Sequence, residues 1–116
     1  MPVPDPFHIQ FNGDGLWDPV THGFTWYNIN SIIFHFEGDV ADGINPDDIT
    51  DFKVFRNGAV LNVNPVYISH GYATDAERTF VDFRISPTLT TLGLYTGTVK
   101  FRGVTFTIYE CKVVAR

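Results

Sequence analysis

A chain of 116 residues is long enough to enclose one hydrophobic core and too short for two, so a single domain is predicted over residues 1–116. The net charge is −5, with only eight Lys and Arg residues. Because binding to a phosphate backbone requires clustered basic side chains, this balance argues against nucleic acid as a partner. No apolar run approaches the roughly 18 residues of a membrane-spanning helix, so no membrane contact is expected.

The charges are unevenly distributed along the chain. Residues 1–52 contain nine acidic and no basic residues, whereas residues 53–116 contain eight basic and four acidic residues. Two interpretations follow. The acidic and basic halves steer copies or partners into complementary contact, or they interleave within one fold and screen each other.

Apolar and polar residues alternate with a period of two through most of the chain, which predicts strands and no helix of appreciable length. In chain order, the first half is expected to form a Pro-rich arm over residues 1–6 and a strand over 7–11. A loop with at most one short strand follows over 16–30, then a second strand over 31–37 and an acidic connection over 38–50.

The second half begins with a hairpin signal. Asn57-Gly58 lies between two alternating segments, and both central positions of a type I′ turn need positive φ. Ser86-Pro87 is expected to end a strand because proline cannot donate to a ladder. The strands predicted in this half cover residues 52–56, 59–63, 66–68, 79–86, 94–102 and 104–114, with a loop over 71–77. About seven to nine short strands of this spacing predict a sandwich or barrel.

An apolar turn followed by Gly93-Leu94-Tyr95 opens the penultimate strand. This pattern resembles the tyrosine corner of immunoglobulin-like domains, in which a Tyr at this place hydrogen-bonds back across the corner. Gly97 stands where an antibody domain has its second cysteine, so the resemblance is to the bacterial and viral Ig-like class and not to the antibody families. Over about residues 31–114, it implies an all-β fold, an antiparallel Ig-like β-sandwich.

Single, cysteine-poor domains of this kind resemble the Ig-like modules of bacteriophage virions, which decorate capsids or belong to tails and baseplates. The resemblance implies a non-catalytic structural protein of the virion, bound to other virion subunits or to copies of itself. Without a virion, a cytoplasmic location is expected, because the N-terminus has no signal-peptide pattern. The Pro-rich arm is pre-extended and suited to docking on a neighbour.

The acidic connection invites a calcium interpretation because hard cations take clustered carboxylate oxygens. The candidate ligands are Asp39, Asp42, Asp47 and Asp48. The alternative is a solvated loop in which Asn45 caps one helical turn that starts at Pro46. The spacing does not match an EF-hand.

The sequence gives little support for a zinc site or for a catalytic nucleophile. The histidines His8, His22, His35 and His70 are scattered, with none of the short spacings typical of zinc sites, and His35 is expected to face outward from its strand. Cys111 lies within the last predicted strand, where a small core residue is expected and not a nucleophile. No cofactor is predicted, and the chain is not expected to be an enzyme.

The chain is rich in aromatic residues, and four of them fall in predicted loops or at strand edges. These are Trp17, Trp26, Tyr27 and Tyr72. If exposed, they would stack on sugar rings or anchor a protein interface, which makes a carbohydrate- or receptor-binding adhesion module the alternative function. In the competing interpretation, Trp17 or Trp26 folds back and covers one end of the sandwich.

Overall fold

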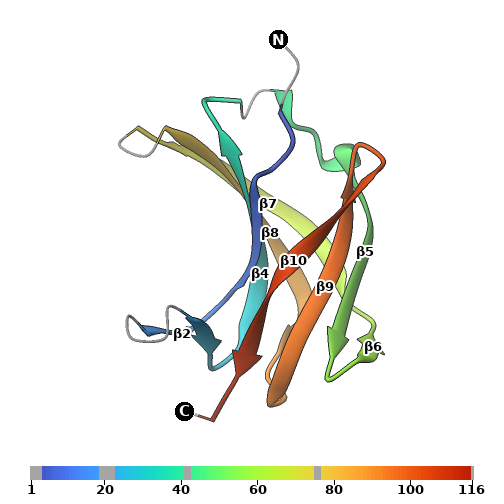
Figure 1. The fold of residues 1–116 in the computed structure, drawn as a ribbon. Helices are drawn as coiled ribbons and strands as arrows, with labels where there is room; N and C mark the ends of the chain where they lie inside the picture. The colour runs from blue at the N-terminus through green and yellow to red at the C-terminus, as the bar shows by residue number, and fades with distance from the viewer. Residues whose placement is uncertain (1–3, 19–22, 41–42, 75–76, 116) are drawn as a thin grey trace.

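The computed structural model describes residues 4–18, 23–40, 43–74 and 77–115, and the chain is mostly β-strand (Figure 1). The predicted all-β class is confirmed. Within the described residues, the ten strands are β1 His8–Asn12, β2 Gly15–Asp18, β3 Gly23–Trp26, β4 Ile29–Glu37, β5 Ile49–Arg56, β6 Ala59–Leu61, β7 Asn64–Ala73, β8 Arg78–Leu89, β9 Gly93–Phe101 and β10 Val104–Val113. None of the described segments forms a helix long and apolar enough to cross a membrane.

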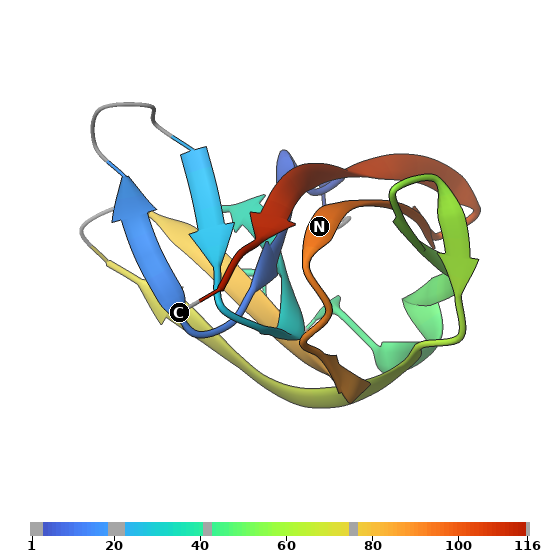
Figure 2. The ribbon, with the colours of Figure 1, turned by 90° about the horizontal axis from the view of Figure 1, so that it is seen from below.

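The strands join into one curled, mixed sheet of order β6-β5-β9-β10-β1-β4-β8-β7, with β3 paired to β10 and β2 paired to β3. Figure 2 shows the sheet bending around its interior. Most neighbours are antiparallel, but β10 runs parallel to β1 and to β3. The predicted antiparallel arrangement does not hold at these two pairs, because strands so distant in sequence are not constrained by a hairpin to run in opposite directions.

Strand β1 joins the two halves of the sheet. It forms a five-residue antiparallel ladder with β4, from His8–His35 to Asn12–Ser31. On its other side, it touches β10 through one parallel pair, Gln10 with Tyr109. The strand that follows the Pro-rich arm therefore connects the sheet of β4, β8 and β7 to that of β10, β9, β5 and β6.

Three segments form more strand than their sequence predicts. Residues 15–26 contain the β2–β3 hairpin, in which Trp17 pairs with Phe24, although Gly and Pro residues obscure any alternation there. Strand β7 extends to Ala73 because its backbone pairs with β8, although apolar and polar residues do not alternate along it. Strand β8 continues past Pro87, which has no N–H to donate and lies where the β4–β8 register shifts.

The hairpin predicted at Asn57-Gly58 is confirmed, and β9 and β10 form a second tight hairpin. The β5–β6 turn has positive φ at both central residues, 49° at Asn57 and 86° at Gly58. The β9–β10 turn has the same pattern, 50° at Arg102 and 83° at Gly103. Positive φ at both positions is typical of type I′ turns, whose twist matches that of the strands they join.

The core lies inside the curl of the sheet and is built from alternate residues of its strands. Its largest fully buried side chains are Tyr95, Phe11, Phe34, Phe36, Phe101, Ile29, Ile32, Ile85 and Ile108. Gly97 permits a close approach here, since a Cβ at this position would lie 2.6 Å from the Lys53 carbonyl oxygen and 3.3 Å from Phe11 Cζ. The Phe11 ring therefore packs beside a glycine.

The corner before β9 has the hydrogen bond that the resemblance implied. The Tyr95 hydroxyl donates to the Thr91 carbonyl oxygen at 2.6 Å, while the ring is 1% exposed. Burial raises the pKa of the Tyr95 hydroxyl, so it stays protonated and able to donate. The bond fixes the corner that leads from β8 into β9.

Replacement of Tyr95 by Phe keeps the ring and removes this hydrogen bond. We expect Tyr95→Phe to lower the free energy of unfolding by about 1 kcal/mol, the usual net value of one buried hydrogen bond. Urea denaturation measures the loss. Tyr72→Phe is the matched control, because Tyr72 is exposed on β7. Equal stability of the two variants would contradict a stabilising role for the corner.

Candidate interaction surface

The four aromatic residues predicted to contact a partner do not form one platform. Trp26 packs half-buried against the core, as the competing interpretation of the sequence expected. Tyr27, which follows it, is also half-buried, whereas Tyr72 on β7 is exposed. The side chain of Trp17 lies outside the described part. Because Tyr27 precedes β4 and Tyr72 lies near its last residue, Glu37, the two occupy opposite ends of the fold (Figure 1).

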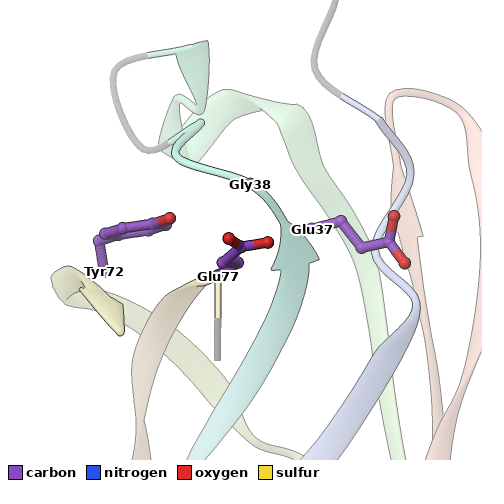
Figure 3. A pocket seen from close by; sticks show the side chains of 4 residues that line it. All are labelled: Glu37, Gly38, Tyr72 and Glu77. Atoms are coloured by element: carbon purple, nitrogen blue, oxygen red, sulfur yellow. The ribbon is translucent and has the colours of Figure 1, made fainter. Parts of the chain in front are cut away.

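Tyr72 lines an open hollow of about 430 Å³ together with Glu37, Gly38 and Glu77. The Gly38 N–H donates to the Glu77 carbonyl oxygen at 2.9 Å, which holds the end of β4 against the start of β8. Figure 3 shows the Tyr72 and Glu77 side chains on the same side of the hollow, while the Glu37 carboxylate points away from them. One aromatic ring and one carboxylate are therefore presented together.

The acidic connection is anchored to the β9–β10 turn through Asp48. The Asp48 carboxylate accepts from the Asn45 backbone N–H at 2.9 Å and from Arg102 Nη2 at 3.3 Å. The Asn45 hydrogen bond is the main cause that lowers the pKa of Asp48, with Arg102 adding to it. Arg102 Nη2 also donates to the Gly43 carbonyl oxygen at 2.7 Å. The 3₁₀ turn at Pro46–Asp48 matches the predicted single turn after Asn45.

The calcium hypothesis stays a prediction. Asp39 and Asp47 are exposed, Asp42 lies outside the described residues, and Asp48 is paired with Arg102. The described parts of the chain contain no group of three or more His, Cys, Asp or Glu side chains placed to hold a metal ion.

Two ion pairs connect the acidic half of the sequence to the basic half. Asp48 pairs with Arg102 at 3.3 Å, and Asp51 pairs with Lys100 at 3.0 Å. Both lie where β5 and its preceding turn meet β9 and the β9–β10 turn. At these places the halves screen each other, which is the second of the two interpretations of the charge asymmetry.

The outer face of the sheet carries a row of rings that the sequence analysis did not identify. Tyr109 on β10, His8 on β1, His35 on β4 and Phe80 on β8 follow one another, with successive ring centroids 5.5, 5.2 and 5.0 Å apart. We call these four residues the ring row. The strand register aligns its last three members, because His8 pairs with His35 and His35 with Phe80. Only that register, and not any motif, reveals the row.

Gln10 connects the two histidines of the ring row. Its Oε1 atom lies 3.1 Å from His8 Nε2 and 3.2 Å from His35 Nε2, so it accepts from both rings when each carries its proton on Nε2. His35 is only 7% exposed despite facing outward, and its Nδ1 has no hydrogen-bond partner among the described residues. The expectation that His35 faces outward is correct, but neighbouring rings cover it.

Burial lowers the pKa of His35 from 6.5 to about 4, with further contributions from the charges of His8 and Arg78. His35 is therefore neutral at neutral pH. A neutral imidazole packs against Phe80 without an unpaired charge, which would be costly in this covered position. The ring row is thus built to hold an uncharged His35 at its centre.

Phe7 and Arg78 extend the ring row at one edge. The Phe7 side chain is 49% exposed, and the Arg78 guanidinium lies 5.2 Å from the centre of its ring. The Phe7 backbone N–H donates to the His35 carbonyl oxygen at 2.9 Å. Pro6 is buried on its own chain, while Pro4 and Asp5 are exposed. The part of the predicted arm next to β1 is therefore fixed to the sheet.

The remaining candidates for chemistry lie apart from the ring row. Cys111 is buried in the core as predicted, and burial, with a smaller contribution from Glu110, raises the pKa of its thiol to about 12. A thiol with this pKa is a poor nucleophile. His70 is exposed on β7, and His22 lies outside the described residues.

Comparisons of the chain with known protein families, with curated proteins and with solved structures found no match. The role of the outer face therefore rests on its own geometry.

The buried His35 makes stability depend on pH. Its folded-state pKa of about 4 lies below its ordinary value of 6.5, so the unfolded chain takes up the proton first as the pH falls. The stabilisation is complete above pH 6.5 and is lost as the pH falls towards 4. As the pH is lowered over this range, we expect the free energy of unfolding of His35→Gln, measured by urea denaturation, to fall less than that of the wild type. His70→Gln, at an exposed site, is the control; parallel slopes in all three proteins would refute the assignment.

Proposed function

We propose that this chain is an immunoglobulin-like module without catalytic function that binds a protein partner through the outer face of β10, β1, β4 and β8. The strand order supports the Ig-like assignment. Without β2 and β3, and divided at the β1–β10 contact, the order becomes β1-β4-β8-β7 and β10-β9-β5-β6. Numbered along the chain, these are strands 1-2-6-5 and 8-7-3-4, the order of the ABED and GFCC′ sheets of Ig domains. The Tyr95 corner is a second, independent support.

The observation that carries the interaction role is the exposure of rings on an ordered sheet face. Tyr109 and Phe7 are 51% and 49% exposed, and Arg78 lies over the Phe7 ring. Aromatic and Arg side chains are enriched at protein interfaces because they bury a large area for little loss of conformational freedom. Their neighbours on the sheet already hold these side chains in place, so binding would cost little further ordering.

We further propose that the partner belongs to a larger assembly. The resemblance to Ig-like modules of bacteriophage virions favours a capsid decoration or tail-associated protein, with other virion subunits or copies of itself as partners. The fixed position of Phe7 and the ring row suits permanent contact with a neighbouring subunit.

Site-specific photo-crosslinking tests the face. A benzoylphenylalanine probe in place of Phe7 or Tyr109 is expected to capture one and the same protein in the native source of the chain. The control probe replaces Val60 on β6, which is 68% exposed but lies at the opposite end of the sheet order. Mass spectrometry identifies the captured protein. Equal capture from position 60, or no capture from either test position, would contradict the proposal.

A carbohydrate-binding role is the second candidate, favoured by the hollow in which Tyr72 and Glu77 lie together. A ring that stacks on a sugar and a carboxylate that accepts from its hydroxyl groups are typical of such sites. If this function is correct, the protein binds a defined glycan on an array, and Tyr72→Ala reduces that binding at least about tenfold. Tyr109→Ala, outside the hollow, serves as the control. An array without any signal would contradict this candidate.

A further inference from the structure

Three outward-facing residues of β8 include two charged side chains that each have a polar atom without a hydrogen-bond partner among the described residues. Arg78, Phe80 and Asp82 alternate with the buried residues of the strand and are all half-buried. Arg78 Nε and Asp82 Oδ1 are buried and have no hydrogen-bond partner among the described residues. Buried polar atoms in folded proteins nearly always have a partner. The chain itself covers these two atoms, so only the part-exposed remainder of each side chain can meet a partner from outside.

Internal partners for these groups would have to come from the adjacent strands. Glu37 lies opposite Arg78 in the β4–β8 register, but the two form no ion pair, and the guanidinium lies over the Phe7 ring instead. Asp82 lies between Ile33 on β4 and Ser69 on β7. Neither charged group of β8 forms an ion pair with a described residue of the adjacent strands.

The two charges are placed symmetrically about Phe80 and are opposite in sign. A twofold axis that lies in the plane of contact and crosses β8 at Phe80 would reverse the strand direction between two copies. Arg78 of one chain would then face the partner's Asp82, and Asp82 would face the partner's Arg78. Phe80 would meet the partner's Phe80. A self-complementary patch of this kind is what an isologous dimer requires.

We propose that the occupant of this face is a second copy of the same chain, bound about a twofold axis at Phe80. This inference rests on the proposed function, because it names the partner of the same surface. A different protein would have to supply an acidic and a basic group at the correct separation. A second copy supplies both by symmetry.

The residues on either side of Phe80 permit this contact. Gly71 on β7 pairs with Phe80, and a Cβ added there would meet no atom within 4 Å. The small residue leaves the edge of the Phe80 ring open to a facing ring. On the other side, His35 would face the partner's His35, and both are neutral at neutral pH because burial lowers the pKa of this group. No like charges therefore meet at position 35.

Charge exchange tests the pairing. In sedimentation equilibrium, the wild type is expected at twice the 13.1 kDa mass of the chain. Arg78→Asp and Asp82→Arg each place like charges opposite each other and should weaken the dimer at least about tenfold. The double variant R78D/D82R restores the pairing in reversed sense and should recover most of that loss. Arg84→Asp is the control, because Arg84 lies on the same face but four residues from Phe80, outside the proposed pairing of Arg78 with Asp82.

A second measurement covers the case in which a single charge variant fails to fold. Phe80→Cys places a thiol on the proposed axis, so oxidation should link two chains, whereas Thr105→Cys on β10 should give no such link. Cys111 is buried and does not interfere. A monomeric wild type, or a dimer that survives both single charge reversals, would overturn the inference. If the wild type is monomeric while probes at positions 7 and 109 still capture another protein, the proposed function stands and the dimer alone is wrong.

Discussion

The fold depends on the pairing of β1 on both of its sides. Its ladder with β4 and its contact with β10 at Gln10 and Tyr109 join the two halves of the sheet. Side chains alternate between the two faces of the sheet along the five residues of β1. Ile9 and Phe11 enter the core, while His8 and Gln10 face outward. Because a strand has a period of two, a register slip of one residue would remove two core residues and break the ring row at once.

The same pairing explains why a histidine is buried on an outer face. His35 is covered because β1 brings Phe7 and His8 beside it and β8 brings Phe80. The covering rings remove water from the imidazole, which disfavours its charged form and lowers its pKa. The nearby positive groups act in the same direction. The neutral state of His35 is therefore a consequence of the strand order and not of its immediate sequence neighbours.

Much of the fold could be predicted from local patterns. Asn57-Gly58 needs positive φ at both residues, and Tyr95 follows an apolar turn and a glycine, so both features were accessible from short segments. The β2–β3 hairpin and the full length of β7 were not, because backbone pairing there does not follow apolar alternation. The parallel contacts of β10 depend on segments almost a whole chain apart.

The candidate surface was harder to predict than the fold. Loop aromatics are an obvious choice by composition, yet Trp26 packs on the core and only Tyr72 of the described predicted side chains is exposed. The ring row consists of residues from four strands whose spacing in sequence carries no motif, and only the register places them together. Registers such as His8 with His35 follow from the sheet as a whole.

The two faces of β8 contribute to stability in opposite senses. Its inward residues Val81, Phe83 and Ile85 are almost completely buried, so they fix the strand through the hydrophobic effect. That burial offsets the cost of Arg78 Nε and Asp82 Oδ1, which are buried without a hydrogen-bond partner among the described residues. The inner face of β8 thus keeps the strand in place although its outer face carries unsatisfied polar atoms.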